Sequence, residues 1–308
     1  MSLWYNSSTY YNNRKKSLTM ENKKYKGIVY IVLSALCFAL MNMFVRLSGD
    51  IPTIQKCFFR NLIAMVFALA ILLKSHDKLI WKKGNLKYLV LRATFGTIGM
   101  LCNFYAVDHL VLSDASMLNK MSPFFAIVFS YLILKERATI TQWLIVLGAF
   151  LGSLLIIKPT FSNMELLPSI IGLCGGLGAG IAYTMVRILG QKGENKSYIV
   201  FFFSAFSCIL TLPISLLNYC PMSAKQWIFL LLAGFCACGG QFAITSAYCY
   251  APAKEISVYD YSQIIFSALL GLIVFQQIPD IFSIVGYIVI CSMAIVMFIY
   301  NNRTPKRD

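Results

Sequence analysis

Acidic residues and histidine are scarce in this sequence. Only 12 Asp and Glu residues and two His residues occur among 308, and charged residues of both signs make up 13% of the chain, against about 25% in soluble domains. No His-Glu-x-x-His motif or paired-aspartate arrangement occurs, and His76 and His109 lie between apolar runs. A membrane-embedded enzyme would therefore lack an evident set of catalytic groups. We expect no enzymatic activity, no cofactor and no metal site.

Apolar residues fill most of the remaining sequence. They make up 58% of the chain and recur in ten runs, each about long enough to cross a hydrocarbon layer of about 30 Å. The runs are 27–48, 53–73, 88–107, 114–134, 139–157, 166–187, 197–217, 226–250, 256–276 and 281–300. The segments between them are short, so successive helices must be antiparallel. The sequence predicts an all-α membrane protein with ten transmembrane helices.

The net charge of +15 could indicate nucleic-acid binding, but the placement of the basic residues favours a membrane. Lys and Arg gather in alternate connections, as expected for cytoplasmic loops beside anionic lipid. These segments are the tail 1–26, the loops 74–87 and 187–196, the turn 135–137 and the tail 301–308. Both termini are then predicted to be cytoplasmic, in the cytoplasmic (inner) membrane of a bacterium, and no nucleic-acid partner is expected. Translation could instead start at Met20, within the polar tail 1–26.

The chain resembles itself at an offset of 141 residues. This offset places Val45-Arg46 on Val186-Arg187, Gly99 on Gly240 and Ala106 on Ala247. It divides the protein into a first repeat, 27–158, and a second, 166–300, with five spans each. Because five is odd, the second copy must be inverted in the membrane. Its loop charges agree, since the basic loop 74–87 corresponds to the Lys-poor loop 218–225. Inverted repeats suit alternating access around a site near the midplane.

Several residues resemble the drug/metabolite transporter superfamily and, within it, EamA-domain transporters. They are Phe58-Phe59-Arg60, Ala106, and the stretch 115–137 with Pro123 and Glu136-Arg137. The resemblance implies a ten-helix carrier in which spans four and nine are central and line a cavity with spans one, three, six and eight. Members of the superfamily move amino acids, nucleosides and other polar metabolites, or expel toxic compounds. Pro123 is expected to bend span four.

Ionisable groups inside a span cost about 2.5–3.5 kcal/mol on insertion scales, so each requires a partner, water or a function. Lys120 lies in span four and Asp260 in span nine, and the offset pairs Asn119 with Asp260. We hypothesise that these three residues, with Tyr259 and Tyr261, line the cavity and bind a polar substrate. A change in protonation of Asp260 would allow coupling to a proton. The alternative is a buried pair with a purely structural role.

Other polar residues complete the predicted site. Arg60 in span two could bind a substrate carboxylate or phosphate through its planar guanidinium, or anchor the helix at the interface. Further cavity candidates, which could instead form hydrogen bonds between helices, are Asn103, Tyr183, Gln241 and Gln263. At helix ends, snorkelling to lipid head groups would account for Arg46, Arg92 and Arg187.

The sequence as a whole predicts a secondary transporter for a small polar metabolite, such as an amino acid or a related compound, working by alternating access. A multidrug or toxic-compound exporter of the same fold is the alternative, and a membrane enzyme, a channel or a receptor fits less well. The expected partners are the substrate, membrane lipids and a coupling proton, and the expected oligomeric state is a monomer or a homodimer.

Overall fold

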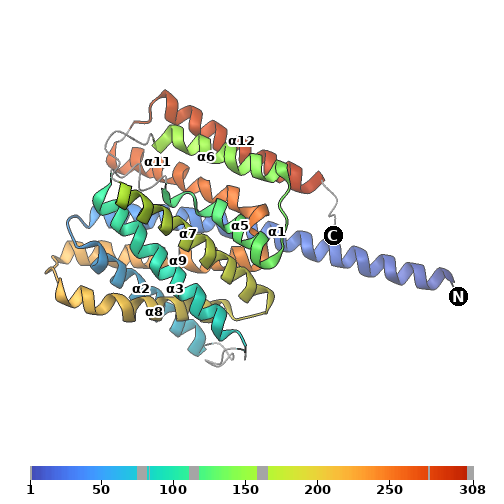
Figure 1. Ribbon diagram of the computed structural model, residues 1–308, viewed down its shortest axis with the longest axis horizontal. Helices are drawn as coiled ribbons and strands as arrows, with labels where there is room; N and C mark the ends of the chain where they lie inside the picture. The colour runs from blue at the N-terminus through green and yellow to red at the C-terminus, as the bar shows by residue number, and fades with distance from the viewer. Residues whose placement is uncertain are drawn as a thin grey trace.

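The computed structural model describes residues 2–74, 82, 84–110, 118–157, 166–276 and 278–303, with side chains from Lys23 onward except those of Phe104, Val107 and Asp108. Every regular element in these residues is helical, as predicted (Figure 1). The elements are α1 (Ser2–Leu47), α2 (Thr53–Lys74), α3 (Leu86–His109), α5 (Ser122–Leu134), α6 (Ile140–Ile157), α7 (Leu166–Gln191), α8 (Lys196–Leu217), α9 (Ala224–Tyr250), α10 (Ala253–Ile256), the 3₁₀ helix η2 (Ser257–Tyr261), α11 (Ser262–Phe275) and α12 (Ile281–Arg303).

Eight helical segments in the described residues are long and apolar enough to cross a membrane. They include Lys23–Leu47 of α1 and Ala253–Phe275, which joins α10, η2 and α11. The helix α5 is apolar but has only 13 residues. Large aliphatic side chains face outward, as Leu217 (85% exposed) and Ile278 (86% exposed) illustrate, which suits a lipid environment. The count of ten spans stays a prediction.

The helix α1 differs from the expected polar tail. It begins at Ser2 and continues without interruption to Leu47, so its first turns project beyond the helical bundle (Figure 1). Near the bundle, Lys24 Nζ donates to Asn302 Oδ1 at the end of α12, with the two atoms 2.6 Å apart. The start of span one and the end of the last helix therefore lie at the same end of the molecule.

The packing of the helices repeats when the two halves are exchanged. The helix α1 packs on α9, and its counterpart α7 packs on α3. Likewise α1 packs on α11, while α7 packs on α5. Two further large contacts, α2 with α8 and α6 with α12, each join a helix to its own counterpart. This is the pattern that a pseudo-two-fold axis between the halves would produce.

Glycines in α6 show the same reciprocity at the residue level. A Cβ atom added to Gly148 would lie 2.7 Å from Met293 Sδ, and one added to Gly152 would lie 2.9 Å from Val289 Cγ1. At the 141-residue offset, Val289 corresponds to Gly148 and Met293 to Gly152. Each residue thus contacts the counterpart of the other, as across a two-fold interface. These glycines allow α6 and α12 to approach closely.

Two residues other than glycine have a left-handed backbone in the described chain, and they too are offset partners. Lys135 ends α5 with a φ of 56° and Gln276 ends α11 with a φ of 54°. This conformation costs an L-residue roughly 1–2 kcal/mol, yet it ends many helices by satisfying their last carbonyl groups. Its recurrence at counterpart positions supports a common ancestry of α5 and α11.

The two central spans are not the continuous helices that the sequence predicted. In the second half, α10 and the 3₁₀ helix η2 precede α11. In the first half, a turn at Lys120 and Met121 precedes α5. Pro123 lies in the first turn of α5 rather than at a bend within a helix, where its missing N–H breaks no hydrogen bond. Short 3₁₀ segments of this kind often mark a hinge or a functional position.

Candidate functional site

The breaks in the two central spans meet at a buried ion pair. Lys120 Nζ lies 3.2 Å from Asp260 Oδ2 and also donates to Gln263 Oε1 at 2.9 Å. Both charged residues are 8% exposed. The predicted pairing of Lys120 with Asp260 is thus present, and Gln263 joins it.

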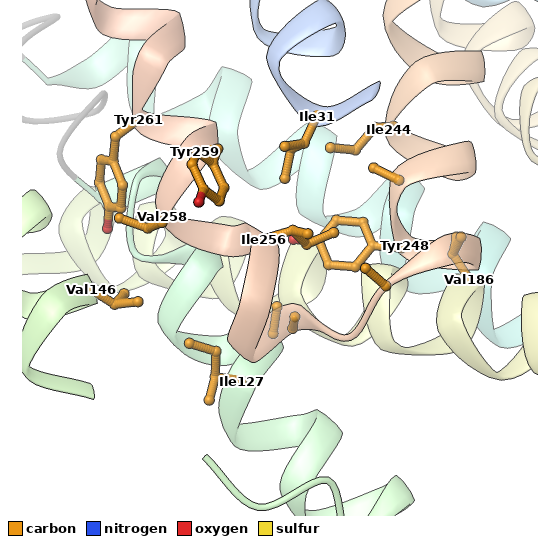
Figure 2. Close-up of a cluster of buried hydrophobic side chains, with 14 of the residues drawn as sticks. Ile31, Ile127, Val146, Val186, Ile244, Tyr248, Ile256, Val258, Tyr259 and Tyr261 are labelled. Atoms are coloured by element: carbon orange, nitrogen blue, oxygen red, sulfur yellow. The ribbon is translucent and has the colours of Figure 1, made fainter. Parts of the chain in front are cut away.

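The backbone beside the ion pair is also tied across the two halves. The Tyr261 hydroxyl donates to the carbonyl oxygen of Lys120 at 3.0 Å, and Tyr261 is fully buried. Figure 2 shows Tyr259, Val258 and Tyr261 on this segment beside Ile256, with apolar side chains from neighbouring helices around them. The ion pair is therefore adjacent to a predominantly apolar core, where charge interactions are stronger than in water.

The repeats indicate where this site lies in the bundle. Lys120 and Tyr261 are 141 residues apart, which makes them counterparts in the two halves. Two counterparts related by a two-fold axis can touch only if both lie near that axis. In an inverted-repeat protein such an axis runs in the membrane plane, so this contact would lie near the middle of the bilayer.

A second polar cluster surrounds Arg92 on α3. Its Nη2 donates to Gln241 Oε1 at 3.3 Å, and its guanidinium carbon lies 4.0 Å from the ring centre of Phe203. Arg92 is only 4% exposed, so the expectation that it snorkels to lipid head groups is wrong. The reason is local: Gly96, one turn along, has no side chain, and the Arg92 guanidinium occupies the space that a Cβ there would need.

Arg60, on α2, also contacts α3. Its Nη1 contacts Met100 Sδ at 3.7 Å, and its guanidinium lies 5.9 Å from the ring centre of Phe38. Tyr183, which stacks on Tyr248 with ring centres 4.8 Å apart, is within electrostatic range of Arg60, Arg92 and Asp260.

The contacts around Arg92 contribute energies of the same order as the cost of its burial. A cation–π contact contributes about 0.5–2 kcal/mol, and a hydrogen bond to a charged group about 1.5–3 kcal/mol. Removing a charge from water costs several kcal/mol even after relaxation. In addition, Nε of both Arg60 and Arg92 is buried without a hydrogen-bond partner among the described residues. The hydrogen-bonding groups of these two arginines are therefore incompletely satisfied.

The remaining predicted residues are more loosely placed. Tyr259 is buried beside the ion pair, and its hydroxyl has no partner within the described part of the chain. Asn119 and Asn103 are partly exposed, and the backbone of Asn103 packs on Gly175 of α7. The structure therefore brings Lys120 and Asp260 together with Tyr259 and Tyr261. Gln241 is hydrogen-bonded to Arg92 instead, and both asparagines are partly exposed.

Two further arginines close the ends of the central helices. Arg187 Nε lies 3.1 Å from Glu136 Oε1, which also accepts from Gln191 Nε2 at 3.1 Å. Its counterpart Arg46 lies 4.5 Å from the ring centre of Phe275, the last residue of α11. Each arginine thus contacts the end of a central helix in the other half, which corrects the expectation that lipid contact alone explains Arg46 and Arg187.

A family model matches the chain twice. The model of the EamA-like transporter family covers residues 25–158 and 167–299. The chain belongs to the EamA-like transporter family. The prediction of an EamA-domain transporter in the drug/metabolite transporter superfamily is therefore confirmed. Within the described residues of this EamA-like chain, no group of three or more His, Cys, Asp or Glu side chains could hold a metal ion.

Relatives of this EamA-like chain extend over nearly its whole length. It is 30% identical over 282 residues to the pseudopaline exporter CntI of Pseudomonas aeruginosa, covering 91% of this chain and 97% of that one. It is 26% identical to an uncharacterized transporter of Helicobacter pylori (89% and 95% covered). It is 27% identical to solute carrier family 35 member G1 of Mus musculus (84% and 74% covered).

One solved crystal structure has the same fold. It superimposes with a TM-score of 0.76 at 13% sequence identity and covers 90% of this chain and 98% of the other. Family and relatives together support an integral protein of the inner membrane that transports small molecules rather than an enzyme.

Proposed function

We propose that this protein is a secondary transporter that moves a small polar metabolite, an amino acid or a related compound, by alternating access. The single observation that carries this proposal is the contact between Lys120 and its counterpart Tyr261 beside the Lys120–Asp260 ion pair. It supports a polar site near the axis that would relate two inverted halves. A site on this axis is equally distant from both membrane faces and can open to either one.

The ion pair supplies the binding chemistry. In the substrate-free protein, Lys120 and Asp260 neutralise each other, and Gln263 accepts a further hydrogen bond. A buried pair of this kind seldom stabilises a fold more than apolar packing would, which favours a functional role. A substrate ammonium group would replace Lys120 at Asp260, and a substrate carboxylate would bind the released Lys120. Asn119, Tyr259 and Asn103 would contribute neutral hydrogen-bonding groups.

Two gates would control access from the two faces. The inner gate consists of Glu136, Arg187 and Gln191, and the outer gate consists of Arg46 and Phe275. Because the gates occupy counterpart positions, rocking of one half against the other would open one gate while it closes the other. The positive-inside distribution places the Glu136 gate and both termini on the cytoplasmic side.

The proposal also includes coupling to a proton and a direction of transport. Protonation of Asp260 would release Lys120 and couple substrate movement to a proton, since a neutral carboxyl group no longer holds the ammonium group. The alternative function is export of toxic compounds by the same fold, and the exporter among the relatives favours an outward direction for this chain. Either would take place in the inner membrane, by a monomer or a homodimer.

Counterflow in proteoliposomes tests the proposal. Purified protein would be reconstituted and screened with radiolabelled amino acids, nucleosides and N-substituted amino acids. We expect saturable exchange of at least one compound, abolished by Lys120→Ala and Asp260→Asn. The exposed residues Lys225 and Asp50 provide matched controls, Lys225→Ala and Asp50→Asn, with unchanged exchange. Full exchange by both site variants would exclude the ion pair from the mechanism.

A further inference from the structure

Two arginines in the bundle lack anionic partners. No carboxylate among the described residues lies within ion-pair distance of Arg60 or Arg92. Arg60 instead lies near Met100 and Phe38, and Arg92 near Gln241 and Phe203. Nε of each is buried and without a hydrogen bond in the described chain. The Lys120–Asp260 pair is neutral as a whole, so within this set of four described residues the two guanidinium groups leave two positive charges without a counter-charge.

The helix α3 fixes the separation of the two guanidinium groups. The Arg92 guanidinium lies against Gly96, and the Arg60 guanidinium lies against Met100. These two positions are four residues apart on one helix, about 6 Å at a rise of 1.5 Å per residue. The two contact points are therefore about one helical turn apart along the axis of α3.

We infer that Arg60 and Arg92 form a binding site for a substrate with two carboxylate groups. This inference rests on the proposed transport function and specifies the substrate class of the same interior site. Each planar guanidinium can bind one carboxylate through two parallel N–H donors, and the free Nε groups are the donors that this geometry uses. A substrate with two carboxylates about one helical turn apart would neutralise both arginines at once.

The ion pair adds a further element to this recognition. Under the proposed function, Asp260 binds the ammonium group of the substrate. An amine on the two-carboxylate substrate would then bind Asp260. The substrate class is accordingly an amino-acid derivative with a second carboxylate, anionic overall at neutral pH.

Binding to purified protein in nanodiscs of neutral lipid tests the inference. Titration calorimetry and thermal stabilisation would compare succinate, glutarate and adipate with butyrate, with cadaverine (a dication of the length of glutarate) and with inorganic phosphate. We expect binding of the diacids, strongest where the carboxylate spacing matches, and none of butyrate or cadaverine. Absence of diacid binding, or phosphate binding more tightly than every diacid, would overturn the two-carboxylate site.

Variants assign the binding to the two arginines. Arg60→Gln and Arg92→Gln should each weaken diacid binding at least tenfold, while Arg303→Gln, at the exposed end of α12, should leave it unchanged. Gly96→Ala retains every charge but displaces the Arg92 guanidinium, and it should also weaken binding. This variant keeps the test decisive if Arg92→Gln fails to fold. Wild-type diacid affinity in well-folded Arg60→Gln and Gly96→Ala would refute the assignment.

The two proposals fail in different ways. If diacids bind through the arginines but no compound shows counterflow, the transport proposal is wrong and the anion site remains. If instead a neutral compound shows saturable counterflow that Arg60→Gln and Arg92→Gln leave at the wild-type rate, transport stands and the two-carboxylate inference is wrong.

Discussion

The hydroxyl of Tyr261 donates to the backbone carbonyl of Lys120 over 3.0 Å, and the two residues are counterparts, 141 positions apart, in the two halves of the chain. The contact therefore joins counterpart positions of the two repeats at the polar centre of the bundle. It also satisfies a carbonyl group next to the turn that precedes α5, where the helical hydrogen-bond pattern is interrupted.

Tyr261→Phe should destabilise the protein. The change removes a buried hydrogen bond and leaves the Lys120 carbonyl unsatisfied, which costs about 1–3 kcal/mol. Thermal unfolding in detergent should show a lower Tm. Tyr259→Phe is the matched control, because the Tyr259 hydroxyl has no partner among the described residues, and its Tm should match the wild type. Equal Tm values for the two variants would argue against the Tyr261 contact.

Removing one member of the ion pair should cost more than removing both. Lys120→Met or Asp260→Leu alone leaves an uncompensated buried charge, at a cost of about 3–5 kcal/mol. The double variant buries no charge and should recover most of the wild-type Tm, while transport stays absent. A double variant that unfolds as readily as the single ones would show a structural role for the pair.

Weakening the Glu136 gate should increase access to the residues beneath it. Glu136→Gln removes the charge that holds Arg187, whose Nη1 also contacts the Cys249 carbonyl at 3.4 Å. In a variant with Cys249 as the only cysteine, maleimide labelling of Cys249 should become several-fold faster. Glu255→Gln, at a partly exposed acidic residue, should leave the labelling rate unchanged. Slower labelling in Glu136→Gln would contradict the gate.

Replacing glycine by alanine should lower the Tm where helices pack closely and should be tolerated where there is space for a Cβ atom. At Gly180 of α7, an added Cβ would lie 2.5 Å from Phe125 Cβ and 2.8 Å from the Ala126 backbone nitrogen. Gly180→Ala should therefore lower the Tm markedly, since the α5 backbone cannot yield cheaply. At Gly239 of α9 the nearest atom is the Cys37 sulfur at 3.2 Å, and Gly239→Ala should be tolerated with little change in Tm.

The sequence was sufficient to predict the helical architecture and the Lys120–Asp260 ion pair. Long apolar runs predict helices directly, and charges as rare as Lys120 and Asp260 stand out within them. The offset of 141 residues then placed the two charges on neighbouring central spans. The pairing followed from the repeat, because Lys120 and Asp260 lie next to each other's counterparts, and counterparts near an axis must also be near each other.

Other features depend on tertiary contacts that no local pattern specifies. The sequence predicted Arg92 to lie near a helix end. Only the packing of α3 on neighbouring helices buries it with Gln241 and Phe203. Its one local signal was Gly96, which makes room for the guanidinium. The breaks before α5 and α11 were missed because their residues are apolar enough to extend a span, while the tyrosine contact across the halves favours the turn.

The opposite orientation of the two halves is the central claim, and labelling of paired loop positions tests it most directly. Lys82 and Ser223 are counterparts at the 141-residue offset. Single cysteines would replace each in a cysteine-free protein, and intact cells or right-side-out vesicles would be treated with a membrane-impermeant maleimide. The account predicts labelling at position 223 from outside, and at position 82 only after the membrane is opened. Labelling of both positions from the same side would contradict inverted halves and the shared central site.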